Sequence, residues 1–159
     1  MSLNLNAERS RPESAYSTSQ SFIDAVNDSQ FVRLFGVVAV IGSILGLLFN
    51  GAVSIGIGLA VMGFGSSRYY RLLGLSVAIL GGATFLLGPL GLLGPIVLSV
   101  GVALKSFQVL SVLAAEGKGD PDWASTQKRA LAGTILSIIA LIIAFIWFVL
   151  VVIALAARR

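Results

Sequence analysis

The chain has 159 residues, of which 57% are hydrophobic and only 11% are charged. Soluble globular domains carry about 25% charged residues, and one small core could not bury so much apolar sequence. The composition therefore excludes an ordinary soluble domain and predicts an all-α, polytopic membrane helical bundle. The net charge is +4, but the basic residues are spread in ones and twos between apolar stretches. That distribution is typical of topogenic charge and argues against nucleic-acid binding, which needs clustered cations.

Residues 1–30 are polar and contain no apolar stretch typical of a cleavable secretory signal. We predict a polar N-terminal tail here and a transmembrane helical domain over residues 31–159. Ser21 followed by Asp24 resembles a capping box, so a short helix is expected over 21–32. This helix would lie at the membrane interface. The alternative is a tail that becomes ordered only on contact with a partner.

Three apolar blocks follow the tail, at residues 34–65, 72–104 and 130–157. Crossing about 30 Å of hydrocarbon takes about 20 helical residues, so the first two blocks are too long for one helix and short for two. Asn50 and Gly51 favour a turn in the first block, and the glycines and prolines from Gly88 to Pro95 break the second. The five predicted segments are 34–49, 51–65, 72–87, 92–112 and 130–156. The first pair either crosses fully or is short and re-entrant.

The charges favour an N-terminus on the cytoplasmic side and a C-terminus on the opposite side. In that orientation the turns at residues 50 and 88–95, which lie outside, carry no charge. The connections that lie inside carry six basic residues: Arg68, Arg71, Lys105, Lys118, Lys128 and Arg129. A single span in the first block would reverse this bias at both places, so we favour two segments there.

The residue types that are missing limit the chemistry of the chain. Without histidine and cysteine it has no imidazole base, thiolate nucleophile or zinc ligand of either kind. The stretches 34–65 and 72–104 contain no charged residue, which disfavours a proton relay or an ion-coupled transporter. The acidic residues within 116–122 lack the spacing of a calcium-binding loop, so a solvated turn is expected. We predict no enzyme, no catalytic residue, no metal site and no cofactor beyond structural lipids; a pigment contact stays compatible with the composition.

Pairs of small residues spaced four apart place two small side chains on one face of a helix, so that another backbone can approach closely. Three such pairs occur: Gly42 with Gly46, Ser54 with Gly58, and Ala78 with Gly82. They serve either packing within the chain's own bundle or association with partner subunits.

Aromatic and basic residues near the ends of the apolar segments are expected to anchor the protein at the membrane interface. Amphipathic rings favour the headgroup level, and long cationic side chains reach it from within the membrane. The predicted anchors are Arg68, Tyr69, Tyr70, Arg71, Lys105, Trp123, Lys128 and Arg129.

Residues 94–145 combine an apolar helix, the segment from Leu113 to Asp120, a polar link, and a second apolar run from Ala132 to Ala144. This pattern resembles the paired-helix region of the dispanin, or interferon-induced transmembrane, family and related small bacterial membrane proteins. The resemblance implies membrane association and interaction, with no catalytic residue to carry over. The juxtamembrane cysteines of that family are missing here, so its lipidation cannot be carried over either.

These features predict a non-catalytic integral membrane protein that serves as a small accessory or scaffold subunit of a larger membrane complex, for example an energy-transducing assembly. The expected partners are membrane lipids and other membrane subunits, and no nucleic acid. Two alternatives stay open: a free membrane-shaping or lipid-interacting protein of dispanin type, and a passive channel or carrier.

Overall fold

The computed structural model of the protein describes residues 13–49, 51–87, 93–116 and 123–158. They form five helices: α1 (Glu13–Phe49), α2 (Gly51–Phe64), α3 (Arg68–Leu87), α4 (Leu93–Glu116) and α5 (Trp123–Ala156). No strand occurs among these residues. The all-α prediction is confirmed, and each predicted segment corresponds to one helix.

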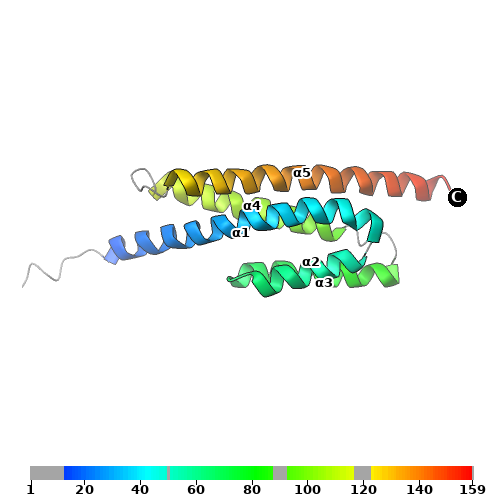
Figure 1. Ribbon diagram of the computed structural model, residues 1–159, viewed down its shortest axis with the longest axis horizontal. Helices are drawn as coiled ribbons and strands as arrows, with labels where there is room; N and C mark the ends of the chain where they lie inside the picture. The colour runs from blue at the N-terminus through cyan, green and yellow to red at the C-terminus, as the bar shows by residue number, and fades with distance from the viewer. Residues whose placement is uncertain (1–12, 50, 88–92, 117–122, 159) are drawn as a thin grey trace, which may run out of the picture.

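The helices run alternately in opposite directions along one common axis (Figure 1). α1 lies in the middle of the view, between the pair α2 and α3 and the pair α4 and α5, and it contacts α2, α4 and α5. α3 also packs against α4. With five antiparallel helices, α1 begins at one end of the bundle and α5 finishes at the other.

Three helices within the described residues are long and apolar enough to span a membrane: Gln20–Leu45, Leu93–Ala115 and Trp123–Ala156. At about 1.5 Å per residue, each is longer than the roughly 30 Å hydrocarbon layer. α2 has only 14 residues, so its length is about 21 Å. Of the first predicted pair, therefore, only α2 is short.

α1 is one continuous helix of 37 residues, which differs from the predicted tail with a separate interfacial helix. It passes residue 30 without a break, because no proline or glycine interrupts the sequence between residues 13 and 35. Its first half is also held by the bundle: Ala25 is buried against Val109 and Leu113 of α4 and Ala130 of α5. The apolar side of residues 21–32 therefore packs on protein and does not lie free at an interface.

The predicted break in the second apolar block falls between α3 and α4. Residues 88–92 lie outside the described residues, as does Asn50 of the predicted first turn. Pro95 instead belongs to the first turn of α4, where a missing N–H breaks no helical hydrogen bond. The Ser99 hydroxyl donates to the Pro95 carbonyl at 2.7 Å.

α4 continues past the predicted end at residue 112, and α5 begins seven residues before the predicted start.

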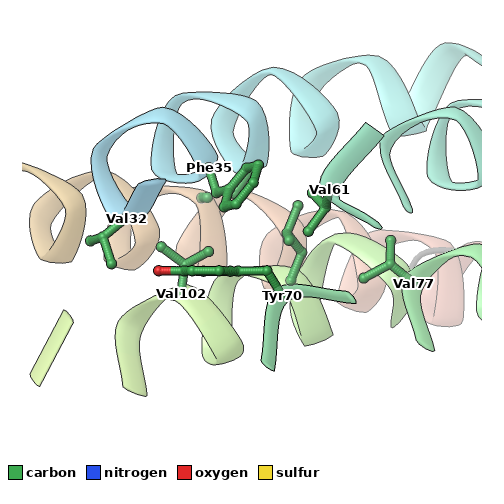
Figure 2. Packing of buried hydrophobic residues seen from close by; sticks show 9 residues of the cluster. Val32, Phe35, Val61, Tyr70, Val77 and Val102 are labelled. Atoms are coloured by element: carbon green, nitrogen blue, oxygen red, sulfur yellow. The ribbon is translucent and has the colours of Figure 1, made fainter. Parts of the chain in front are cut away.

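A core of mainly small and β-branched residues joins all five helices. Its buried members are Val32, Phe35, Ala39, Val61, Tyr70, Val77, Leu98, Val102 and Ala140. Figure 2 shows the Tyr70 ring extending below Phe35 toward Val102. This single aromatic side chain therefore fills the space where α1, α3 and α4 meet.

Glycines set how closely α2 and α3 approach. A Cβ added at Gly58 would lie 2.5 Å from the Gly74 carbonyl oxygen and would collide with the backbone of Ala78. A Cβ added at Gly74 would lie 2.6 Å from Met62 N, and one at Gly81 would lie 2.7 Å from a backbone nitrogen of α2. The two backbones therefore touch along this face, with no room for larger side chains.

Glycines also set how closely α1 and α5 approach. A Cβ added at Gly36 would lie 3.1 Å from Leu136 Cβ and 3.3 Å from the Gly133 carbonyl oxygen. About two turns further along α1, Ser43 Oγ lies 3.1 Å from the Ala140 carbonyl oxygen of α5. Close approach of the backbones thus also allows a hydrogen bond between the two helices.

We expect Gly58→Ala to lower the thermal stability of the protein in detergent, because the added methyl group would force α2 away from α3. Overpacking of this kind costs about 1–3 kcal/mol. Gly56→Ala is the matched control, since a Cβ there meets no atom within 4 Å, and alanine favours a helix over glycine by about 1 kcal/mol. Thermal unfolding followed by circular dichroism measures both; equal losses from the two variants would contradict the packing described.

Candidate functional site at the charged end of the bundle

The charged residues of the helices gather at one end of the bundle, which we call the charged end. It contains the first half of α1, the last turn of α2, the start of α3, the second half of α4 and the start of α5 (Figure 1). Its charged side chains are Asp24, Asp28, Arg33, Arg68, Arg71, Lys105, Lys128 and Arg129. Toward the opposite end, the described residues carry no charge before Arg158.

An ion pair between α1 and α4 lies at this end. Lys105 Nζ is 2.9 Å from Asp28 Oδ2, and each side chain is only 15% exposed. The same ammonium group lies 3.1 Å from Gln108 Oε1 and 5.5 Å from the centre of the Tyr69 ring. The Tyr69 hydroxyl in turn donates to the Gly101 carbonyl at 2.7 Å. Lys105 therefore connects two helices, whereas the sequence predicted a side chain extending to the headgroups.

Tyr70, a predicted interface anchor, is fully buried. Its ring centre lies 5.0 Å from that of Phe35 and 5.7 Å from that of Phe31. Its hydroxyl oxygen lies 3.5 Å from the backbone carbonyl oxygen of Asp28, which is longer than an ordinary O–H···O hydrogen bond. The prediction of a membrane-facing ring is wrong for Tyr70, because α1 covers this side of α3.

The other predicted anchors lie nearer the surface. Trp123 is half-buried, and its Nε1 donates to the Leu113 carbonyl at 3.1 Å, which satisfies an acceptor near the end of α4. Three of them are exposed basic residues: Arg68, Arg71 and Lys128. Arg129 is half-buried. Their contact with headgroups stays a prediction.

Some of the predicted small-residue pairs lie at helix contacts. Ser54 is buried, and a Cβ added at Gly94 of α4 would lie 2.8 Å from its Oγ. A Cβ added at Gly42 would collide with Ile57 of α2. The surroundings of Gly46 lie outside the described residues.

Gly82 does not belong to a packed face, because a Cβ added there meets no atom within 4 Å. The partner of Ala78 on the contact face of α3 is Gly74, four residues earlier, and Gly81 extends this face. A spacing of four residues fits a pair of Ala78 with Gly74 and equally a pair of Ala78 with Gly82. Only the position of α2 distinguishes them.

A cavity of about 470 Å³ lies beside the ion pair. Most of its lining is polar: Ser21, Asp24, Asn27, Asp28, Ser66, Ser67, Lys105 and Gln108. Ser67 Oγ is buried and has no hydrogen-bond partner within the described part of the chain. No group of three or more acidic side chains in the described ranges could hold a metal ion. The cavity is thus suited to water or a small polar ligand.

Comparison with known proteins gave no matching family, no matching curated protein and no matching solved structure. The dispanin resemblance therefore stays a prediction. What the protein does must be inferred from the geometry of its helices.

We expect Lys105→Met to destabilise the protein, because it leaves the largely buried Asp28 carboxylate without its partner. A lost hydrogen bond to a charged group costs about 1.5–3 kcal/mol. Asp28→Asn combined with Lys105→Met removes both charges, so the double variant should lose less stability than the sum of the two single variants. Arg71→Gln, at an exposed position on α3, serves as the charge control. Additive losses in denaturation midpoints would show that the two side chains do not interact.

Proposed function

We propose that the protein is a small, non-catalytic accessory or scaffold subunit of a larger membrane assembly, which docks on a partner helix through the outer face of α2. This face contains Ala52, Gly56, Ala60 and Gly63, whose spacing of three or four residues places them together, and the exposed Leu59 lies between the two glycines on the same side. All but the half-buried Ala60 are exposed. A Cβ added at Gly56 or Gly63 would meet no atom within 4 Å.

The outward glycines are the observation that carries the proposal. Glycine in a helix costs about 1 kcal/mol relative to alanine, and contact with lipid gives nothing in return. The exposed side of α5 has large side chains instead, including Ile135, Ile142 and Phe145. On the inner face of α2, Gly58 allows the backbone of α3 to approach. We infer that the outer glycines allow a foreign helix to approach in the same way.

The length of α2 supports the same proposal. Its 14 residues extend over about 21 Å, less than the hydrocarbon layer of about 30 Å. A helix that is too short for the membrane is accommodated by thinning of the bilayer or by contact with other helices. Docking on a longer partner helix would shield the ends of α2 from lipid.

A free membrane-shaping role has less support. That role needs an amphipathic helix whose apolar side can enter the membrane surface. Over residues 21–32 this side contains Ala25 and Val32, and both are buried within the bundle. Within residues 21–32, Ile23 is the only large apolar side chain that is exposed, so this segment has little apolar surface for contact with lipid.

The proposal also places the charged end on the cytoplasmic side, because basic connections are retained there. The chain has no cysteine, so a cysteine introduced at the exposed position Ala124 would be the single site at which a thiol reagent reacts. An impermeant maleimide should label it only after the membrane has been opened. Labelling in intact cells would contradict this orientation, because it would show that the charged end lies outside.

We expect Gly56→Leu with Gly63→Leu to release the protein from its assembly, because two large side chains would fill the space reserved for a partner helix. Neither leucine should clash within the bundle, since both positions open outward. Ala154→Leu on the exposed part of α5 is the matched control. The measurement is the apparent mass of the tagged protein after mild solubilisation of its native membrane. A wild-type protein that migrates without other subunits would refute the proposal, as would a double variant that stays in the complex.

A further inference from the structure

We propose that a groove between α1 and α5 binds one anionic phospholipid, with the phosphate held by two arginines and an acyl chain lying along α1. The groove has a volume of about 480 Å³. Four residues of α1 and one of α5 line it: Gln30, Arg33, Leu34, Val37 and Arg129. This site lies on other helices than the proposed docking face of α2 and does not depend on it.

The charge of the groove is positive and uncompensated. No acidic residue lines it. Arg33 is exposed and Arg129 is half-buried, and within the described residues neither guanidinium takes part in an ion pair or hydrogen bond. The contrast is Lys105, whose charge is neutralised by Asp28. Two free guanidinium groups from neighbouring helices can donate several hydrogen bonds to one phosphate.

The lining changes from polar to apolar along α1. Arg33 and Leu34 each lie three or four residues from both Gln30 and Val37, so the four form one stripe that leads away from the charged end. Ile41 and Ile44 continue this stripe, and they are 48% and 50% exposed. A ligand that follows it needs a charged head and an apolar tail.

The length of the stripe fits one leaflet of a membrane. Arg33 and Ile44 are eleven residues apart, which corresponds to about 16 Å along a helix, or about half of the hydrocarbon thickness. A phosphate at Arg33 would therefore place the end of its acyl chain near Ile44. Free phosphate would occupy the guanidinium groups alone and leave the apolar stripe uncovered. The geometry thus favours a phospholipid, and basic pockets between membrane helices are known to bind anionic headgroups.

Native mass spectrometry of the full-length protein in detergent, titrated with phosphatidylglycerol or phosphatidylcholine, tests the proposal. The wild-type protein should retain one phosphatidylglycerol in preference to phosphatidylcholine. Arg33→Gln and Arg129→Gln should each weaken this binding about fivefold, and the double variant should lose the preference. Arg71→Gln, which removes an exposed charge outside the groove, should keep it. Equal binding of the two lipids by the wild-type protein would overturn the proposal, as would an equal effect of Arg71→Gln.

A second arm separates a phospholipid from a free phosphate. Leu34→Ser with Val37→Ser keeps both arginines but removes apolar surface at two exposed positions, so phosphatidylglycerol binding should weaken while the protein stays folded. Inorganic phosphate at millimolar concentration should not displace the lipid from the wild-type protein. Displacement by phosphate, or unchanged lipid binding by the serine variant, would contradict an acyl chain on α1.

Discussion

Backbone contact at glycine residues is the constraint on which this bundle depends. Apolar side chains gain little free energy by moving from lipid into contact with protein, so membrane helices associate through close packing and interhelical hydrogen bonds. α2 meets α3 at Gly58 and Gly74, and α1 meets α5 at Gly36 and Gly133, where a Cβ would come too close to the facing helix. These contacts form two helix pairs. Tyr70, buried beside α1 and α4, fills the space between them.

The charges of the bundle divide into two groups with different consequences. The Lys105–Asp28 pair is largely buried and joins α4 to α1, so its contribution is to the position of these helices. Arg33 and Arg129 line an open groove and keep their hydrogen-bonding capacity available. The proposed lipid site and the proposed docking face of α2 both follow from surfaces that the bundle leaves unused. An accessory subunit would then be held in its assembly by a helix contact and in its leaflet by a phospholipid.

Block lengths and turn residues were sufficient to predict five helices, because apolar segments and their breaks are local features of composition. The early start of α1 could not be predicted in this way, since Ala25 is buried by residues of α4 and α5 that are distant in sequence. The packing role of Gly58 was predicted from its spacing to Ser54. The same spacing wrongly paired Ala78 with Gly82, although the glycine that shares the packed face of α3 with Ala78 is Gly74. Local spacing shows which residues can share a face, but only the neighbouring helix decides which face is packed. For the same reason, no pattern in the sequence connected Lys105 with Asp28.

The most direct test of close backbone approach is disulfide formation between α1 and α5 in this naturally cysteine-free chain. A Cβ at Gly36 lies 3.1 Å from Leu136 Cβ, near the separation of about 3.5–4.5 Å in disulfides. The variant with Gly36→Cys and Leu136→Cys should therefore form an intramolecular disulfide on mild oxidation in the membrane, measured by free thiol content and non-reducing electrophoresis. Gly36→Cys with Ile135→Cys should not, since Ile135 is 57% exposed and faces away. Absence of the bond in the first variant, or equal formation in both, would contradict the account.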